Sequence, residues 1–157
     1  MLLAQRNLLD VFRFQNQYLG IYPQAFDQVS MISGMQVQPV EDSQVVWDFR
    51  FPRLGKRGRL LDTVGLLEDD EIQLSTQAVA YMITRQSYTL ALLMPGTPQQ
   101  YKLAVDAIKP LNLDQLHLPS HWPEDIFSQA MRFHMRKIAL LDEQKLLTQI
   151  GLRTNRR

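Results

Sequence analysis

Apolar residues recur at helical spacing at the start of the chain. The positions that share this spacing are Ala4, Leu8, Val11, Phe12, Tyr18 and Leu19. Arg6, Asp10 and Arg13 fall on the opposite face, where Arg6 and Asp10 are four residues apart and can pair. Gly20 follows, and glycine readily adopts the left-handed conformation that ends a helix. The pattern predicts a helix over residues 2–19.

The pattern changes to a period of two in the middle of the chain, residues 29–95. Its clearest stretch is Val45 to Phe51, where Trp47 and Phe49 alternate with Asp48 and Arg50. Further strands are expected within 29–40, over 60–67 and 72–83, and over 88–94. Residues 85–87 are expected to turn between the last two of these strands. A helix through 74–84 remains an alternative, because no breaker interrupts that segment.

Helical spacing returns in the last third, residues 97–151. Thr97-Pro98 is a good helix start and Pro110 a stop. Pro123 is expected to open a longer helix. Its apolar stripe is Phe127, Met131, His134, Ile138 and Leu141. Asp142 is expected to cap a continuation that ends at Gly151.

Together these elements predict an α+β fold. We expect one globular domain over 1–157, with an N-terminal helix, an antiparallel β-meander of four or five strands, and two or three C-terminal helices packed on one face. The length agrees with a single domain, because about 100–150 residues is the commonest domain size.

Composition narrows the function classes without choosing one. The 157 residues include no cysteine, which excludes disulfides and thiolate chemistry. Seventeen basic and 16 acidic residues give a net charge of +1, so no global field attracts nucleic acid or membrane. The longest apolar runs, such as 78–83, fall far short of the roughly 20 residues of a spanning helix. The N-terminus lacks the pattern of a signal peptide. We therefore expect a cytoplasmic protein with no membrane partner and no cofactor.

The most distinctive segment is the basic stretch Arg50–Arg59. Its five cations are Arg50, Arg53, Lys56, Arg57 and Arg59. Pro52, Gly55 and Gly58 favour an exposed loop between two strands. Such a loop suits contact with phosphate, nucleotide or nucleic acid. The alternative, which we favour, is a solvated loop whose charge is neutralised by Asp62 and the acidic run 68–71.

The helix expected from Pro123 carries more apolar residues than one stripe needs. A helix with such wide apolar coverage is either deeply buried or packs against a second chain. This predicts a contact with another protein through Phe133, Met135, Arg136 and Leu140.

The remaining polar residues form no catalytic or metal-binding motif. Pro119 separates His117 from His121 and disfavours a helical metal site there. Glu124 and Asp125 are the nearest carboxylates.

Three functions stay open. The leading one is a non-catalytic protein-binding module: an adaptor, accessory subunit, chaperone or inhibitor, acting in a hetero- or homo-oligomer. The second is a nucleic-acid or nucleotide binder using Arg50–Arg59. The third is an enzyme or lipid carrier with a site near the histidines.

Overall fold

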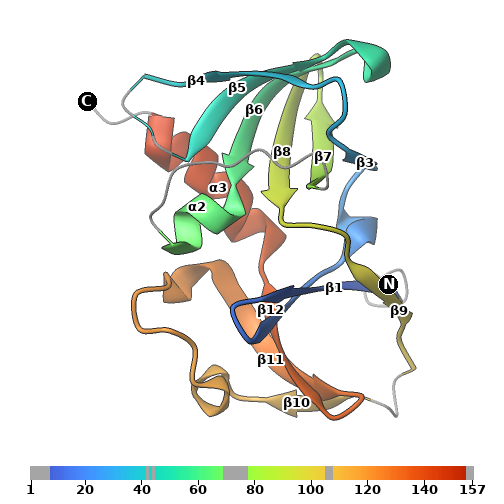
Figure 1. The fold of residues 1–157 in the computed structure, drawn as a ribbon, viewed down its shortest axis with the longest axis vertical. Helices are drawn as coiled ribbons and strands as arrows, with labels where there is room; N and C mark the ends of the chain where they lie inside the picture. Colours follow the sequence, from blue (N-terminus) through green and yellow to red (C-terminus); the bar gives the residue numbers. More distant parts are fainter. Residues whose placement is uncertain (1–7, 42, 44, 69–77, 105–107, 155–157) are drawn as a thin grey trace.

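Two six-stranded β-sheets make up most of the protein in the computed structural model (Figure 1), which describes residues 8–41, 43, 45–68, 78–104 and 108–154. In spatial order the first sheet contains β10 (Lys109–Leu111), β11 (Phe127–Phe133), β12 (Arg136–Leu141), β2 (Gln17–Ile21), β1 (Leu8–Phe14) and β9 (Gln99–Lys102). The second contains β3 (Gln28–Met31), β7 (Val79–Arg85), β8 (Tyr88–Met94), β6 (Lys56–Asp62), β5 (Val46–Phe51) and β4 (Gln36–Pro39).

Both sheets follow the same plan. Each has two antiparallel hairpins side by side, joined by a parallel pair and flanked by one further strand at each edge. The parallel pair is β2 with β12 in the first sheet and β6 with β8 in the second. The first sheet is built from both ends of the chain, whereas all strands of the second lie between them in sequence.

A glycine lies at each parallel pair. A methyl group on Gly20 in β2 would come within 2.9 Å of side-chain atoms of Ile138 and Leu140 in β12. A methyl group on Gly58 in β6 would overlap the backbone of Thr89 in β8, 1.7 Å from its carbonyl oxygen. The two backbones therefore approach too closely at Gly58 for any other residue without displacement of a strand.

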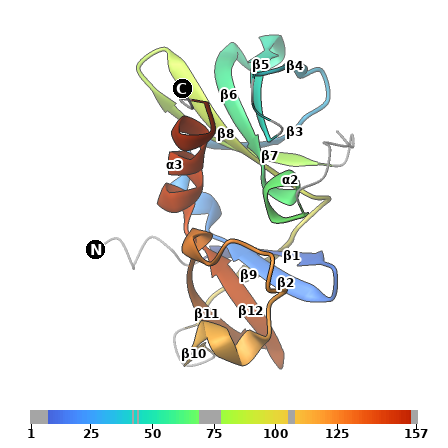
Figure 2. The same ribbon diagram turned by 90° about the vertical axis from the view of Figure 1, so that its left-hand side faces the viewer.

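Two α-helices lie in the described residues, and each follows a strand and is capped by an aspartate. Asp62 ends β6 and accepts from the backbone N–H groups of Val64 and Gly65 in α2 (Thr63–Glu68). Asp142 follows β12, and its carboxylate accepts from the N–H of Lys145 in α3 (Glu143–Thr154) at 3.0 Å. This confirms the expected cap, although the helix continues past Gly151. α3 leaves the first sheet and lies along β5, β6 and β8 of the second (Figure 2).

Apolar side chains form three clusters. Two of them belong to one sheet each. The cluster of the first sheet contains Leu9, Val11, Met131, Phe133, Ile138 and Leu140, and that of the second contains Phe49, Phe51, Leu60, Met82 and Leu93, among others. The largest cluster joins the sheets to α3 through Phe12, Leu19, Ile21, Val46, Leu61, Tyr81, Leu92, Leu146, Leu147 and Ile150, among others. Many strands are consequently covered on both faces.

A buried polar pair also links the two sheets. The Tyr81 hydroxyl of β7 donates to the Asp10 carboxylate of β1 at 2.6 Å, and the Gln100 side-chain amide donates to the same carboxylate at 2.8 Å. Tyr81 is fully buried and Asp10 is 2% exposed. Burial, followed by the contact with Asp10, raises the pKa of the Tyr81 phenol well above its ordinary value. The hydroxyl therefore stays a donor.

The predicted α+β architecture is wrong. Residues 8–21 form a hairpin instead of a helix, and residues 1–7 lie outside the described part. The expected helices over 97–141 are β9, β10, β11 and β12 with short 3₁₀ turns, so α3 is the only one of the predicted C-terminal helices in the described chain. Strands covered on both faces lose the alternation of apolar and polar residues, and their apolar positions then imitate a helical stripe.

The strand predictions in the middle of the chain are partly confirmed. β5 and β8 lie where alternation predicts them, and β7 decides 79–85 in favour of a strand. The strand predicted over 60–67 is wrong in its second half, because the residues after Asp62 form α2. The meander is wrong too, because β6 pairs parallel to β8 and β3 and β4 lie at opposite edges of the second sheet. The acidic run falls outside the described residues after Glu68.

Candidate functional site

The residues predicted to contact a partner lie on a β-hairpin. Phe133 ends β11 and Leu140 lies in β12, and both are buried in the cluster of the first sheet. Met135 is at the tip of this hairpin and is 97% exposed. Arg136 begins β12 beside it and is half-buried. Only Met135 and Arg136 thus reach the surface, and Phe133 and Leu140 support them from below.

The turn at this tip has an unusual sequence for its backbone. His134 and Met135 both have positive φ, at 52° and 63°. Two such residues between paired strands correspond to a type I′ turn, which strongly favours Asn-Gly. The β1–β2 hairpin makes the same kind of turn with Gln15 and Asn16. Neither His nor Met is a preferred residue there, and residues held in such conformations cluster at functional sites.

Polar and aromatic contacts fix the base of the tip. The Arg136 guanidinium donates to the Tyr101 hydroxyl at 3.0 Å and to the Gln99 side-chain oxygen at 3.3 Å. It also lies 4.9 Å from the centroid of the Tyr18 ring. The His134 ring packs against Tyr101 with a centroid distance of 5.6 Å. These contacts fix both neighbours of Met135, while Met135 itself remains exposed at the tip.

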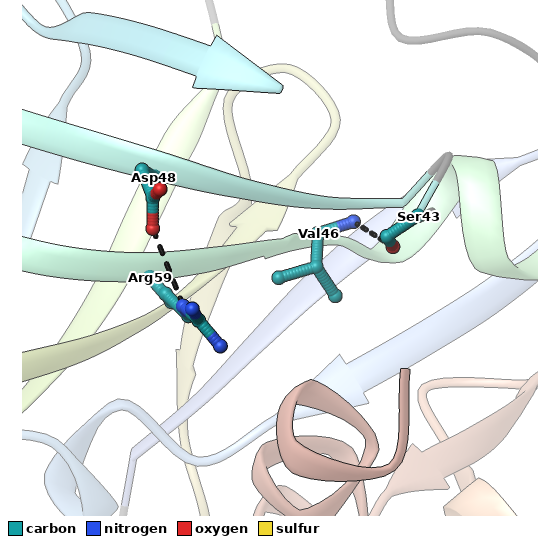
Figure 3. A network of polar contacts seen from close by, with 4 residues as sticks. All are labelled: Ser43, Val46, Asp48 and Arg59. Atoms are coloured by element: carbon teal, nitrogen blue, oxygen red, sulfur yellow. Dashed lines mark hydrogen bonds and ion pairs between the residues drawn. The ribbon is translucent and has the colours of Figure 1, made fainter. Parts of the chain in front are cut away.

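The five cations of the basic segment lie on more than a loop. Only 52–55 connect the strands, while Arg50 belongs to β5 and three of the cations to β6. Arg59 pairs with Asp48 across the two strands at 3.2 Å (Figure 3). Arg53 donates to the Ser30 hydroxyl at 3.4 Å and lies 5.2 Å from the Phe51 ring centroid.

Arg50 and Arg57 are the exceptions. They are direct partners in the β5–β6 register, and neither makes an ion pair with a residue of the described chain. Like charges directly opposite one another destabilise a sheet. The expected neutralisation by Asp62 is wrong, because Asp62 is buried at the far end of β6, where it caps α2.

A groove of about 580 Å³ opens beside these two arginines. Its lining is Arg50, Pro52, Gly55, Lys56, Arg57, Thr84, Gln86, Ser87 and Thr89. It therefore holds three cations and three hydroxyls and no carboxylate. Lys56 donates to the Thr84 hydroxyl at 2.9 Å, and that hydroxyl bonds the Thr89 hydroxyl at 2.9 Å.

The histidines divide between two places. His117, in a left-handed conformation at φ 55°, lines a pocket of about 300 Å³ together with Asp114 and Glu124, over Trp122 and Phe127. His121 and Asp125 are not among the residues that line it. His134 lies far along the chain in the β11–β12 turn. In the described ranges no three histidine or carboxylate side chains are grouped so that they would hold a metal ion.

Sequence reasoning missed two aromatic residues at these sites. Tyr101 anchors Arg136, and Tyr88, which is 45% exposed, lies close to Arg57 and Arg59. Burial raises the pKa of Tyr88, and the positive charge of Arg59 partly opposes the rise. No sequence signal identifies either residue, because both neighbourhoods depend on strand pairing between distant segments.

Comparison with known proteins identifies the fold. No protein-family model matches the sequence, and a search of curated proteins gives no match. Among solved structures, the chain is similar to the scaffolding protein TtCheW from Thermoanaerobacter tengcongensis, with a TM-score of 0.59 and 10% identity. The superposition covers 87% of this chain and 84% of that chain. At this identity the likeness concerns the fold alone. Among the described residues, no helix has the length and apolar character needed to cross a membrane.

Proposed function

We propose that this protein is a non-catalytic protein-binding module that acts as an adaptor or scaffold in a cytoplasmic assembly. The observation that carries the proposal is the shared fold with a protein described as a scaffolding protein. The tip of the β11–β12 hairpin agrees with it, since its exposed Met135 offers an adaptable apolar contact on a base held by the Arg136 hydrogen bonds.

In this proposal Met135 inserts into an apolar pocket of the partner. Arg136 orients the tip and offers its remaining N–H groups to the partner's rim. Phe133 and Leu140 contribute indirectly, because they fill the cluster on which the hairpin rests. Methionine suits this role because its flexible, polarizable side chain adapts to an irregular apolar surface.

Site-specific photo-crosslinking tests the proposal. A photoreactive amino acid replaces Met135 in one variant and Met31 in a control variant, since Met31 is also exposed but lies on edge strand β3 of the other sheet. We expect a defined protein adduct, identified by mass spectrometry, from position 135 alone.

The identified partner is then purified and titrated. We expect Met135→Ser to weaken its binding at least tenfold, as truncation of a central interface residue does, and Met31→Ser to leave it unchanged. Equal adducts from both positions, or equal affinity of both serine variants, would contradict the proposed surface. A protein that is strictly monomeric and captures no partner in either form would contradict the proposed function.

A further inference from the structure

One face of the second sheet carries a row of charged residues that the hairpin tip does not involve. Arg85 pairs with Tyr88 across β7 and β8, and Arg50 pairs with Arg57 across β5 and β6. The parallel register pairs Gly58 with Thr89, so one residue earlier it sets Arg57 beside Tyr88. Residues in register point to the same face of a sheet. The row is therefore Arg85, Tyr88, Arg57 and Arg50 across four neighbouring strands.

The next row on this face differs in its charge balance. It contains Arg59 and Asp48, which neutralise each other. The outer row has three arginines and no acid, and none of the three makes an ion pair within the described ranges of the chain. Its length is three strand spacings, or about 14 Å at roughly 4.8 Å each. Positive charge is thus concentrated at one end of a molecule whose net charge is only +1.

The groove of about 580 Å³ adjoins this row and has the donors that an anion requires. Arg50 and Arg57 belong to both the row and the groove. Lys56, Thr84 and Thr89 are each one residue from a row position, so they leave their strands on the opposite face and line the groove from that side. The Lys56 ammonium group is fixed there by the Thr84 hydroxyl. Guanidinium, ammonium and hydroxyl groups together are the donors used for phosphate. The volume is that of a small-molecule site. The exposed ring of Tyr88 lies in the row beside Arg57, outside the residues that line the groove, and offers a surface there for stacking a planar group.

We propose that this groove binds a phosphate-bearing small ligand of nucleotide size. Arg50 and Arg57 contact the phosphates, and the unfavourable opposition of these two cations is relieved when the anion lies between them. Lys56 and the groove hydroxyls complete the phosphate site, while Tyr88 faces the remainder of the ligand. The size of the groove and the four-residue row favour such a ligand over a nucleic-acid strand, which needs a longer basic track.

Isothermal titration calorimetry on the full chain tests this assignment with pyrophosphate, ATP and a single-stranded oligo-dT as probes. We expect ATP to bind and Arg57→Gln and Arg50→Gln each to weaken it at least tenfold. The matched control is Arg59→Gln, on the same strand and face but paired with Asp48, which we expect to change ATP affinity less than threefold. Pyrophosphate binding alongside ATP would assign recognition to the phosphates. ATP binding without pyrophosphate binding, if it is lost in Tyr88→Ala, would assign part of the recognition to stacking on the Tyr88 ring.

Three results would overturn the proposal: no binding of pyrophosphate or ATP, equal loss in Arg59→Gln and Arg57→Gln, or binding of oligo-dT alone. Thermal unfolding guards against misfolded variants, because Arg57→Gln removes a like-charge opposition and should not lower Tm. The outcome is separable from that of the protein-binding proposal. Arg57→Gln leaves the β11–β12 tip intact, and its crosslinks through position 135 should persist.

Discussion

Removing the Tyr81 hydroxyl tests how the two sheets are held together. Tyr81→Phe keeps the ring and its edge-to-face contacts with Phe12 and Phe26, at centroid distances of 6.1 and 5.5 Å. It deletes the 2.6 Å hydrogen bond to Asp10 and leaves that buried carboxylate with the Gln100 amide. A hydrogen bond to a charged group contributes about 1.5–3 kcal/mol. We expect the free energy of unfolding to fall by that amount.

Urea denaturation at neutral pH measures this loss, and a thermal scan should show Tm lower by roughly 3–12 °C, at about 2–4 °C per kcal/mol. The control is Tyr88→Phe, which removes a hydroxyl from the exposed side of the same hairpin and should stay within about 0.5 kcal/mol of wild type. A Tyr81→Phe variant as stable as that control would refute the view that the Asp10–Tyr81 bond joins the sheets.

Alkaline pH offers an independent check on the same hydroxyl. The pKa of Tyr81 is raised in the native state, so the unfolded chain releases this proton at about pH 10 while the native protein retains it. The contribution of this hydroxyl to the free energy of unfolding is fully present below pH 10, and it declines above pH 10 by about 1.4 kcal/mol per pH unit. Tyr81→Phe should lack this part of the decline. Parallel curves for wild type and variant would contradict the assignment.

Three further predictions concern single positions. Gly58→Ala should lower the free energy of unfolding in urea by about 3 kcal/mol or more, because its methyl group overlaps the backbone of Thr89. Its control, Gly151→Ala, adds a methyl group in open space on α3 and should raise that free energy by about 0.5–1 kcal/mol. Equal effects of the two variants would be inconsistent with a close strand contact at Gly58. Asp142→Ala should lose about 1 kcal/mol with the α3 cap and Asp142→Asn should restore it, so a neutral alanine variant would argue against the cap. Burial raises the pKa of Asp62, so between the two pKa values the native state holds a proton that the unfolded chain releases. The stability that this group contributes therefore falls as pH rises from about 4 through the native pKa. Asp62→Asn should abolish that fall when stability is measured across acid pH, and an unchanged profile would contradict the assignment.

The sequence predicts structure well where one face of a strand is covered over most of its length. β5 alternates apolar and polar residues and is found where the alternation predicts it. Prediction from the sequence fails where both faces of a strand are covered. In β1, Leu9 and Val11 enter one cluster and Phe12 another, so every second position no longer stands out. Parallel pairing of β6 with β8 has no local signal at all.

The candidate sites show the same division. The concentration of charge in 50–59 is evident in the sequence, but its division into the paired Arg59 and the unpaired Arg50 and Arg57 depends on strand register. The prediction of Met135 as a contact residue rests on an expected helix, whereas the structure places Met135 at a hairpin tip. Tyr88 enters the basic row only through pairing between β6 and β8.

The origin of the first sheet from both chain ends has a consequence for synthesis of the protein. Tyr18 of β2 is in register with Ile138 of β12, so their pairing closes a loop of about 120 residues. All strands of the second sheet lie within residues 28–94 and leave the ribosome before β11 and β12. The β1–β2 hairpin therefore waits with the outer edge of β2 unpaired until β12 has been translated. Contacts this distant in sequence form slowly, and an open strand edge is where nascent chains associate wrongly. That exposure ends only with β12, which follows every other strand of the described residues in sequence.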